Sequence, residues 1–309
     1  MRALVEIVTA VLVASCDSSA RARDVVPSRV RSLPIAPVHG HAALLLSAHL
    51  RLARDHVRLP CMSMELRSSA NDVLANLDWL CDVTATGLVM DVANDERTLV
   101  WTEGRPGLWT GTTERESRTQ LWTGCTYPWF QPRWAAGQRY VFFLECPMDF
   151  RTSWVSRLDT EVGTVVRVVQ APTGSLLGAD PDERGETVCV TSVSEQGTLT
   201  ASVWRVRNAA VLLHLQGRNC VMSPSGRRLA ILTSAEMDTA AVCLTVVSLE
   251  PEARRMALRL PQFRSLDIEG LAWSAHEDSV WVAAGDLLLP FPVARGGRPV
   301  TEREAARCH

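Results

Sequence analysis

The sequence predicts an all-β fold, a β-propeller built from four-stranded blades. A unit recurs five times: a short apolar strand, a polar turn rich in Asp, Ser or Gly, and a second, strongly apolar strand. The first apolar residues of the second strands are Leu99, Val141, Val188, Leu229 and Val280, so the copies are 42, 47, 41 and 51 residues apart. This period is the size of one propeller blade. We expect six blades, five of which are clear in the sequence.

We assign the outer strands of each blade to the segments between these units. Many of these segments alternate apolar and polar residues, whereas the second strand of each unit is almost continuously apolar. An inner strand that is buried on both faces is expected to be apolar at almost every position, whereas a strand with one face in water is expected to alternate apolar and polar residues. The predicted outer strands are residues 107–112 and 119–124, 152–159 and 163–170, 198–208 and 209–216, 239–250 and 253–260, and 286–294 with 298–304 as a weak last strand.

Composition agrees with a single large domain. The 309 residues are 47% hydrophobic and carry a formal net charge of −2, which is enough for a large core and gives no basic face for nucleic acid. All 32 basic residues are Arg. The absence of Lys excludes Schiff-base chemistry, a catalytic Lys base and a phosphate-binding P-loop, because each needs an ε-amine.

The N-terminus resembles a bacterial lipoprotein signal peptide. Arg2 precedes an apolar stretch from Ala3 to Ala14, which is too short to span a bilayer and is followed by Ser15 and Cys16. The resemblance implies that Cys16 receives the lipid and becomes the mature N-terminus. We therefore expect a lipid-anchored, extracytoplasmic protein of the cell envelope. The alternative is a cytoplasmic protein in which this stretch is a buried strand or helix.

The domain organisation follows from this interpretation. Residues 1–16 are the signal peptide, residues 17–38 a Pro- and Arg-containing tether, and residues 39–309 the propeller domain. Residues 39–84 fit either a degenerate sixth blade or a helix. We prefer the blade, since six blades of this size use the remaining chain, and an N-terminal strand would then complete the last blade and cover its edge.

The nine cysteines fit an exported protein. Without Cys16 eight remain, an even number that permits disulfides in an oxidising compartment. The pairs to test first are Cys125 with Cys146 and Cys61 with Cys81. By contrast, Cys189 and Cys243 lie in apolar strands, where we expect free thiols that pack as small hydrophobic side chains.

Two units carry a resemblance to a known family. The segments SPSGRRLAIL (223–232) and WSAHEDSVWVA (273–283) resemble the WD-like repeats of TolB-type β-propellers, whose blades have a turn similar to Ser-Pro-Asp-Gly before an apolar strand. The resemblance covers residues 85–292, with Ser225 in place of the Asp. It implies the fold, because this motif builds turns. TolB has an additional N-terminal α/β domain that does not fit before residue 85, so its partner role is not transferred.

No chemical motif stands out. The sequence contains no GxSxG, GxGxxG or HExxH, so we expect no catalytic, cofactor-binding or metal-binding residues. The acidic cluster in the third unit is interpreted as turn chemistry, with a calcium site as the weaker alternative. Its members are Asp180, Asp182, Glu183 and Glu186.

Three function classes remain. The preferred one is a non-catalytic, lipid-anchored envelope propeller that binds a protein or glycan partner through its loops. Trp129 and Trp134, in the Pro-flanked PWFQPRW segment, are the candidate partner surface. The alternatives are a propeller enzyme, a hydrolase or lyase with its site at the mouth of the central channel, and a cytoplasmic WD-repeat-like scaffold. The fold itself does not discriminate among them.

Overall fold

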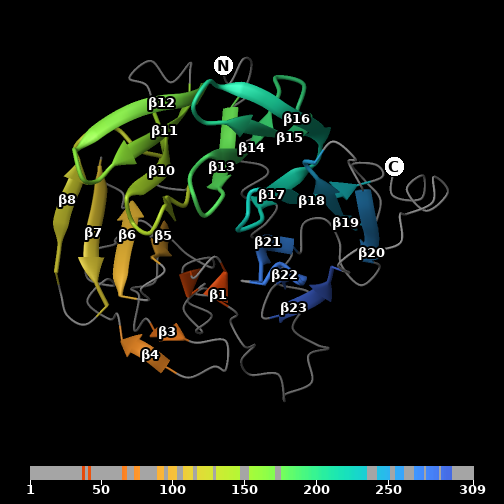
Figure 1. The fold of residues 1–309 in the computed structure, drawn as a ribbon, viewed down its shortest axis with the longest axis horizontal. Coiled ribbons are helices and arrows are strands. Elements are labelled where there is room, and N and C mark those ends of the chain that lie inside the picture. Colours follow the sequence, from red (N-terminus) through yellow and green to blue (C-terminus); the bar gives the residue numbers. More distant parts are fainter. Residues whose placement is uncertain are drawn as a thin grey trace.

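The computed structural model is all-β in the part of the chain that it describes. The described residues are 37–38, 41–42, 65–67, 73–76, 89–93, 97–102, 107–113, 117–127, 130–146, 153–170, 175–234, 242–250, 255–260, 268–274, 276–284 and 287–293. Their strands form antiparallel sheets that follow one another around a centre (Figure 1). Within these ranges no helix has the length and apolar character needed to cross a membrane.

Four sheets have four strands each, in chain order, as the repeat period predicts. The first strand of each sheet lies towards the middle of the molecule and the fourth at its periphery (Figure 1). These sheets are the blades of a β-propeller. The first comprises β5 (Val89–Val92), β6 (Thr98–Thr102), β7 (Leu108–Thr112) and β8 (Thr119–Trp122). The second comprises β9 (Arg133–Ala135), β10 (Tyr140–Glu145), β11 (Trp154–Asp159) and β12 (Thr164–Gln170).

The third and fourth blades have the longest strands. The third comprises β13 (Ser175–Pro181), β14 (Thr187–Val193), β15 (Leu199–Arg205) and β16 (Ala210–Gln216). The fourth comprises β17 (Arg218–Met222), β18 (Arg228–Ser234), β19 (Val242–Ser248) and β20 (Arg255–Leu260). Every outer strand expected for these blades is present, so the assignment of strands from the alternating pattern is confirmed here.

The remaining sheets are smaller. The fifth blade comprises three described strands, β21 (Ile268–Trp273), β22 (Ser279–Ala284) and β23 (Leu287–Pro292). The expected fourth strand at 298–304 lies outside the described residues. Two hairpins precede the first blade, β1 (Pro37–Val38) with β2 (His41–Ala42), and β3 (Glu65–Arg67) with β4 (Val73–Asn76). β2, β3 and β4 lie in the segment 39–84 expected to form a sixth blade, and β1 lies at the end of the predicted tether. The sixth blade stays a prediction.

The core is divided into layers between neighbouring blades. The first apolar residue of each second strand has 0% exposure; these residues are Leu99, Val141, Val188, Leu229 and Val280. On β10, Phe143 packs with the first blade and Phe142 with the third, because successive side chains of a strand point to opposite faces. A strand that packs on both faces must be apolar at every position, which explains the almost continuous apolar pattern of the second strands.

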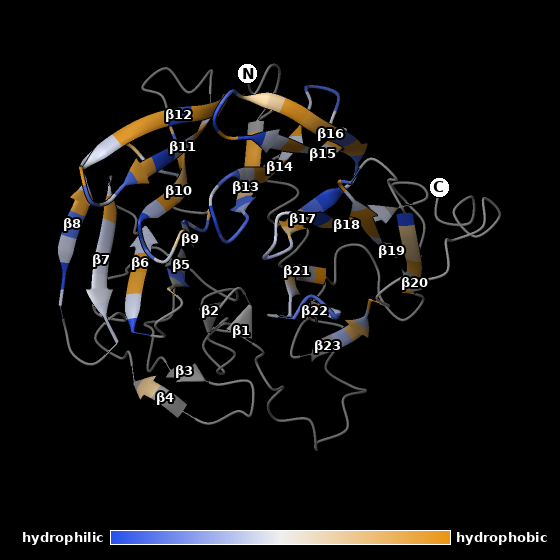
Figure 2. Cartoon of the chain, in the orientation of Figure 1, coloured by the Kyte–Doolittle hydropathy of each residue, from blue (hydrophilic) through white to orange (hydrophobic). Residues whose placement is uncertain are grey.

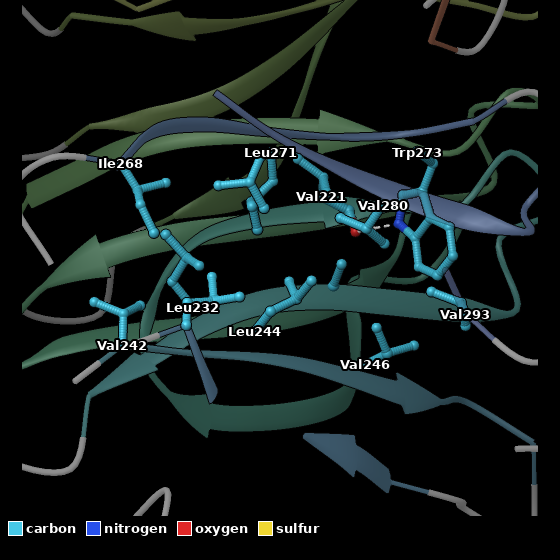
Figure 3. Packing of buried hydrophobic residues seen from close by; sticks show 13 residues of the cluster. Val221, Leu232, Val242, Leu244, Val246, Ile268, Leu271, Trp273, Val280 and Val293 are labelled. Carbon is cyan, nitrogen blue, oxygen red and sulfur yellow. Dashed lines mark hydrogen bonds between the residues drawn. The ribbon is translucent and has the colours of Figure 1, made fainter. Parts of the chain in front are cut away.

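The last layer shows how an inner strand contributes to this core. Val221 on β17 packs with Leu244 on β19 and Val280 on β22 (Figure 3). Trp273 on β21 lies at the end of this layer and is fully buried. Its indole N–H donates to the backbone oxygen of Val221 at 3.1 Å, so the polar atom of the largest side chain in the layer is satisfied.

The fourth strands are the ones that water reaches, whereas β19, a third strand that the sequence predicted to have one face in water, is buried at six of its seven positions. Figure 2 shows apolar stretches along β12 and β16 at the periphery. Val166 on β12 is 50% exposed and Val211 on β16 is 51% exposed. The prediction of a water-facing outer strand is therefore confirmed for the fourth strands β12 and β16 and is wrong for β19.

Candidate functional site at the turn face

The turns between the first and second strands are closed by polar side chains at equivalent positions. In the third blade Asp182 Oδ1 accepts from the backbone N–H of Glu186 at 2.8 Å and of Thr187 at 3.2 Å. Ser223 Oγ takes this place in the fourth blade and accepts from the N–H of Arg228 at 3.1 Å. Short side-chain oxygens that bond the backbone a few residues ahead stabilise tight turns. The interpretation of Asp182 as turn chemistry is confirmed.

These turns contact one another from blade to blade. The N–H of Ala136 donates to the backbone oxygen of Glu183 at 2.6 Å, and the N–H of Glu183 donates to the backbone oxygen of Pro224 at 3.2 Å. The next contact runs from the N–H of Ser225 to Glu277 Oε1. Turns of the second, third, fourth and fifth blades are therefore linked. We call residues 136–139, 182–186, 223–227 and 276–278 together the turn face.

The ion pair between the last two turns has a marked effect on a carboxylate. Arg228 Nη2 lies 2.9 Å from Glu277 Oε2 and also donates to the Glu277 backbone oxygen at 2.8 Å. Burial raises the pKa of the Glu277 carboxyl, but the hydrogen bonds from Ser225 and Arg228 lower it more, so the net pKa lies below its ordinary value. Glu277 is thus held ionised as the link between the fourth and fifth blades.

Asp182 has the opposite electrostatic environment. Its side chain is buried beneath the turn face, and this burial raises the pKa of its carboxyl above the ordinary value, although the N–H groups of Thr187 and Glu186 lower it in part. Asp182 therefore acts as a hydrogen-bond acceptor for the turn.

A charged cluster joins the inner strands just below the turn face. Asp91 on β5, Arg133 on β9 and Asp180 on β13 occupy the same position in three consecutive repeats, eight residues before the first apolar residue of the second strand. Arg133 Nη1 lies 3.5 Å from Asp91 Oδ1, and Arg133 Nε lies 3.3 Å from Asp180 Oδ1. One guanidinium therefore bridges two carboxylates from the blades on either side.

Each of these aspartates also holds the backbone of the next blade. Asp91 Oδ2 accepts from the N–H of Trp134 at 2.8 Å, and Asp180 Oδ2 accepts from the N–H of Met222 at 2.9 Å. The prediction that Asp180 belongs to a turn is therefore wrong: it lies in β13 and connects three blades. Sequence reasoning also missed Asp91 and Arg133. An alignment of the repeats shows charged residues at this inner-strand position in the first three, whereas the fourth and fifth have Val221 and Ala272.

The predicted partner surface is not assembled in the described residues. Trp134 is 5% exposed and packs with Val141 and Phe143 between the first two blades, so we assign it to the core. Its place is fixed by the alternation of β9, which turns Trp134 inward. Trp129 and Cys16 lie outside the described residues, and their roles stay predictions.

One of the two predicted cysteine pairs is confirmed. Cys125, which follows β8, and Cys146, the residue directly after β10, form a disulfide. Cys189 is a buried free thiol, as expected, but the same prediction is wrong for Cys243, which is disulfide-bonded. The predicted pair of Cys61 and Cys81 lies outside the described residues. A buried strand position therefore does not exclude a disulfide.

The surface of the turn face is charged and of mixed sign. Glu183, Arg184, Glu186, Arg227 and His276 are exposed on it. In the described part of the chain, no three His, Cys, Asp or Glu side chains come together as a metal site. The turn face is therefore a hydrogen-bonded platform whose exposed side chains can form ion pairs and hydrogen bonds with a partner.

Comparisons with known proteins agree on the fold. No family model and no curated protein matches the sequence. The structure is similar to TolB from Acinetobacter baumannii, with a TM-score of 0.50 and 12% identity over 75% of this chain and 60% of that one. The chain thus spans less than two thirds of that TolB structure. A propeller domain of Cps50 (Swd1) from Myceliophteria thermophila has the same TM-score and 7% identity over 75% and 78% of the two chains.

A third similar structure belongs to a different kind of protein. Hydrazine synthase from Kuenenia stuttgartiensis matches with a TM-score of 0.50 and 9% identity, over 72% of this chain and 68% of that one. Identities this low show the fold alone, and the three proteins do not share a function by name. The chain is a β-propeller with TolB-like structural neighbours, and its function must come from its own residues.

Proposed function

We propose that the protein is a non-catalytic, lipid-anchored β-propeller of the cell envelope that binds a protein or glycan partner through its turn face. The observation that carries the binding role is the set of hydrogen bonds that joins the turns of four blades. Loops already fixed in one arrangement lose little conformational entropy on binding, which favours affinity.

The charge pattern favours a protein partner over a glycan. Arg184 is exposed between Glu183 and Glu186 in one turn of the turn face, and Arg227 is exposed in the neighbouring turn, where its Nη1 lies 3.7 Å from Glu250 Oε1. Charges of both signs orient a protein partner and exclude partners with the wrong pattern. In addition, none of the large hydrophobic side chains exposed in the described residues is aromatic.

The disulfide chemistry supports the envelope location. Cys125–Cys146 is a disulfide and Cys243 is disulfide-bonded. Structural disulfides persist in oxidising compartments and are rare in the cytosol. This agrees with the signal-like sequence that ends at Cys16 and disfavours the cytoplasmic scaffold.

The binding role can be tested by site-specific photo-crosslinking in the organism that encodes the protein. A photoreactive residue replaces Arg184 on the turn face or, as the matched control, Glu195 in the turn between β14 and β15. Both positions are exposed, and the β14–β15 turn lies at the opposite end of the blade. We expect a discrete adduct from position 184 and none from 195.

The adduct also distinguishes the two kinds of partner. A protein partner gives an adduct that protease digestion converts to identifiable peptides, and a glycan gives one that glycosidases remove. Equal adducts from positions 184 and 195, or none from 184 and from 227, would contradict binding through the turn face.

A further inference from the structure

Two free cysteines meet at the boundary between the third and fourth blades. Cys189 on β14 has 0% exposure and Cys220 on β17 has 7% exposure. Both are free, and both belong to the same buried cluster, together with Met222 and Ile231. They come from adjacent blades, so a bond between them would join two sheets.

Hydrogen bonds hold the Cys220 segment against Cys189 from two sides. Cys220 Sγ lies 3.3 Å from Thr191 Oγ1, and the Cys220 N–H donates to the same oxygen at 3.3 Å. Thr191 is two residues from Cys189, so the two side chains lie on one face of β14. On the other side Asp180, the cross-strand partner of Cys189, accepts from the N–H of Met222. Cys220 is therefore fixed beside Cys189.

The environment determines when these thiols can react. Burial raises the pKa of the Cys189 thiol well above its ordinary value, and its hydrogen bond with Cys220 raises it further. Thiol–disulfide exchange requires a thiolate. Because Cys189 is fully buried and its thiolate is disfavoured, we expect the bond to form while the two blades are still docking.

We propose that Cys189 and Cys220 form an inter-blade disulfide when the chain folds in an oxidising compartment. The two thiols lose two protons and two electrons and form one S–S bond. A small disulfide oxidant, such as glutathione disulfide, accepts the electrons and is released as two thiols. The cellular setting rests on the proposed envelope location, but the bond itself can be tested in solution.

The disulfide would reinforce a boundary that already contains the Asp180–Met222 and Thr191–Cys220 hydrogen bonds. It would close a loop from residue 189 to residue 220, which includes β15 and β16 and the start of β17. A cross-link of this kind stabilises the native fold mainly by restricting the unfolded chain. We expect the oxidised protein to show a higher Tm than the Cys220→Ala variant folded in the same buffer.

Tryptic mapping tests the bond directly. The reduced, unfolded full chain is refolded with glutathione and glutathione disulfide, free thiols are blocked, and the protein is digested without reduction. Cys189 lies in the tryptic peptide 185–205 and Cys220 in the peptide 219–227, each with one cysteine. We expect these two peptides to be linked and to separate on reduction. The link between peptides 119–133 and 140–151 reports Cys125–Cys146 and serves as the internal control.

Two results would overturn the proposal. One is recovery of peptides 185–205 and 219–227 separately, each with a blocked thiol, from protein that carries the Cys125–Cys146 link. The other is a link from either peptide to a different cysteine. Material purified from cells without refolding is mapped in parallel. A 189–220 link that forms in solution and is absent from cellular protein would contradict the envelope location, while the disulfide itself would stand.

Discussion

Asp180 on β13 accepts a hydrogen bond from the backbone N–H of Met222 on β17, at a distance of 2.9 Å. The same contact occurs two blades earlier, where Asp91 on β5 accepts from the N–H of Trp134 on β9 at 2.8 Å. In both cases a buried carboxylate pairs with a backbone donor on the first strand of the next blade. These aspartates therefore set the position of one blade relative to the next, a role that hydrophobic packing alone does not specify.

Removing one of these carboxylates should destabilise the fold. Asp180→Ala leaves the N–H of Met222 without its acceptor and removes one of the two carboxylates beside Arg133. We expect a loss of about 2–3 kcal/mol of unfolding free energy, the scale for a buried hydrogen bond to a charged group. Denaturant unfolding measures this loss, and Glu195→Ala, at an exposed turn position, is the control. Equal midpoints for the two variants would show that Asp180 does not connect the blades.

The Ser-Pro-Ser-Gly turn should require its glycine for two separable reasons. Gly226 has φ +71°, and a Cβ added there would collide with Asp182 Oδ2. Gly137 has φ +58° in the corresponding turn of the second blade, but a Cβ there meets nothing within 4 Å. We expect Gly137→Ala to cost about 1–2 kcal/mol for the left-handed backbone alone.

Gly226→Ala should cost at least about 1 kcal/mol more than Gly137→Ala, because it adds overpacking to the backbone term. Thermal and denaturant unfolding of the two variants give the difference. If Gly226→Ala were no worse than Gly137→Ala, the close contact between the turns of the third and fourth blades would be disproved.

Stability should depend on pH through Glu277. The pKa of this carboxyl is lower in the folded protein than its ordinary value, so the folded state favours the ionised form. Its contribution is therefore present above the unfolded pKa of about 4.3 and is lost as pH falls through the lower folded value. We expect Glu277→Gln to be less stable than the wild type at neutral pH.

The difference between wild type and Glu277→Gln should shrink as the solution is acidified below the unfolded pKa. Unfolding free energies at a series of pH values measure it, with Glu195→Gln as the control. A difference that stays constant with pH would mean that the ionised carboxylate does not bond Arg228 and Ser225 in the folded protein.

The two ends of the burial gradient should respond differently to truncation. Leu229, at the start of β18, is fully buried, whereas Val211 on the outer strand β16 is 51% exposed. Leu229→Ala should cost about 2–5 kcal/mol, because it removes buried methyl groups and leaves a cavity. Val211→Ala should change stability by no more than about 0.5 kcal/mol. Comparable losses would contradict the assignment of inner and outer strands.

The fold could be predicted because its signal is repeated. Each blade needs a second strand that packs on both faces, so the apolar segments at Val188 and Leu229 recur at a fixed spacing. The polar turns recur for a similar reason, since Asp182 and Ser223 each close a turn by local hydrogen bonds. Local chemistry and periodic burial are both visible in one sequence.

The site could be predicted much less well, because its contacts join residues far apart in the chain. Arg133 pairs with Asp91 and Asp180, which are more than forty residues away in either direction. The proline-flanked segment predicts a surface position for Trp134, but the alternation of β9 places this side chain in the core. The register of a strand decides which of its side chains face the neighbouring blade. A turn-rich segment does not reveal this register, so the burial of Trp134 could not be predicted.

The most direct test of the proposed envelope role is the intact mass and cell fractionation of the full chain expressed in a bacterial host, beside a Cys16→Ala variant. We predict a membrane-associated protein whose first residue is a diacylated Cys16, and loss of both the lipid and the membrane association in the variant. A soluble protein of full-length mass, with Met1 or Arg2 at its N-terminus, would contradict the lipid-anchored envelope role.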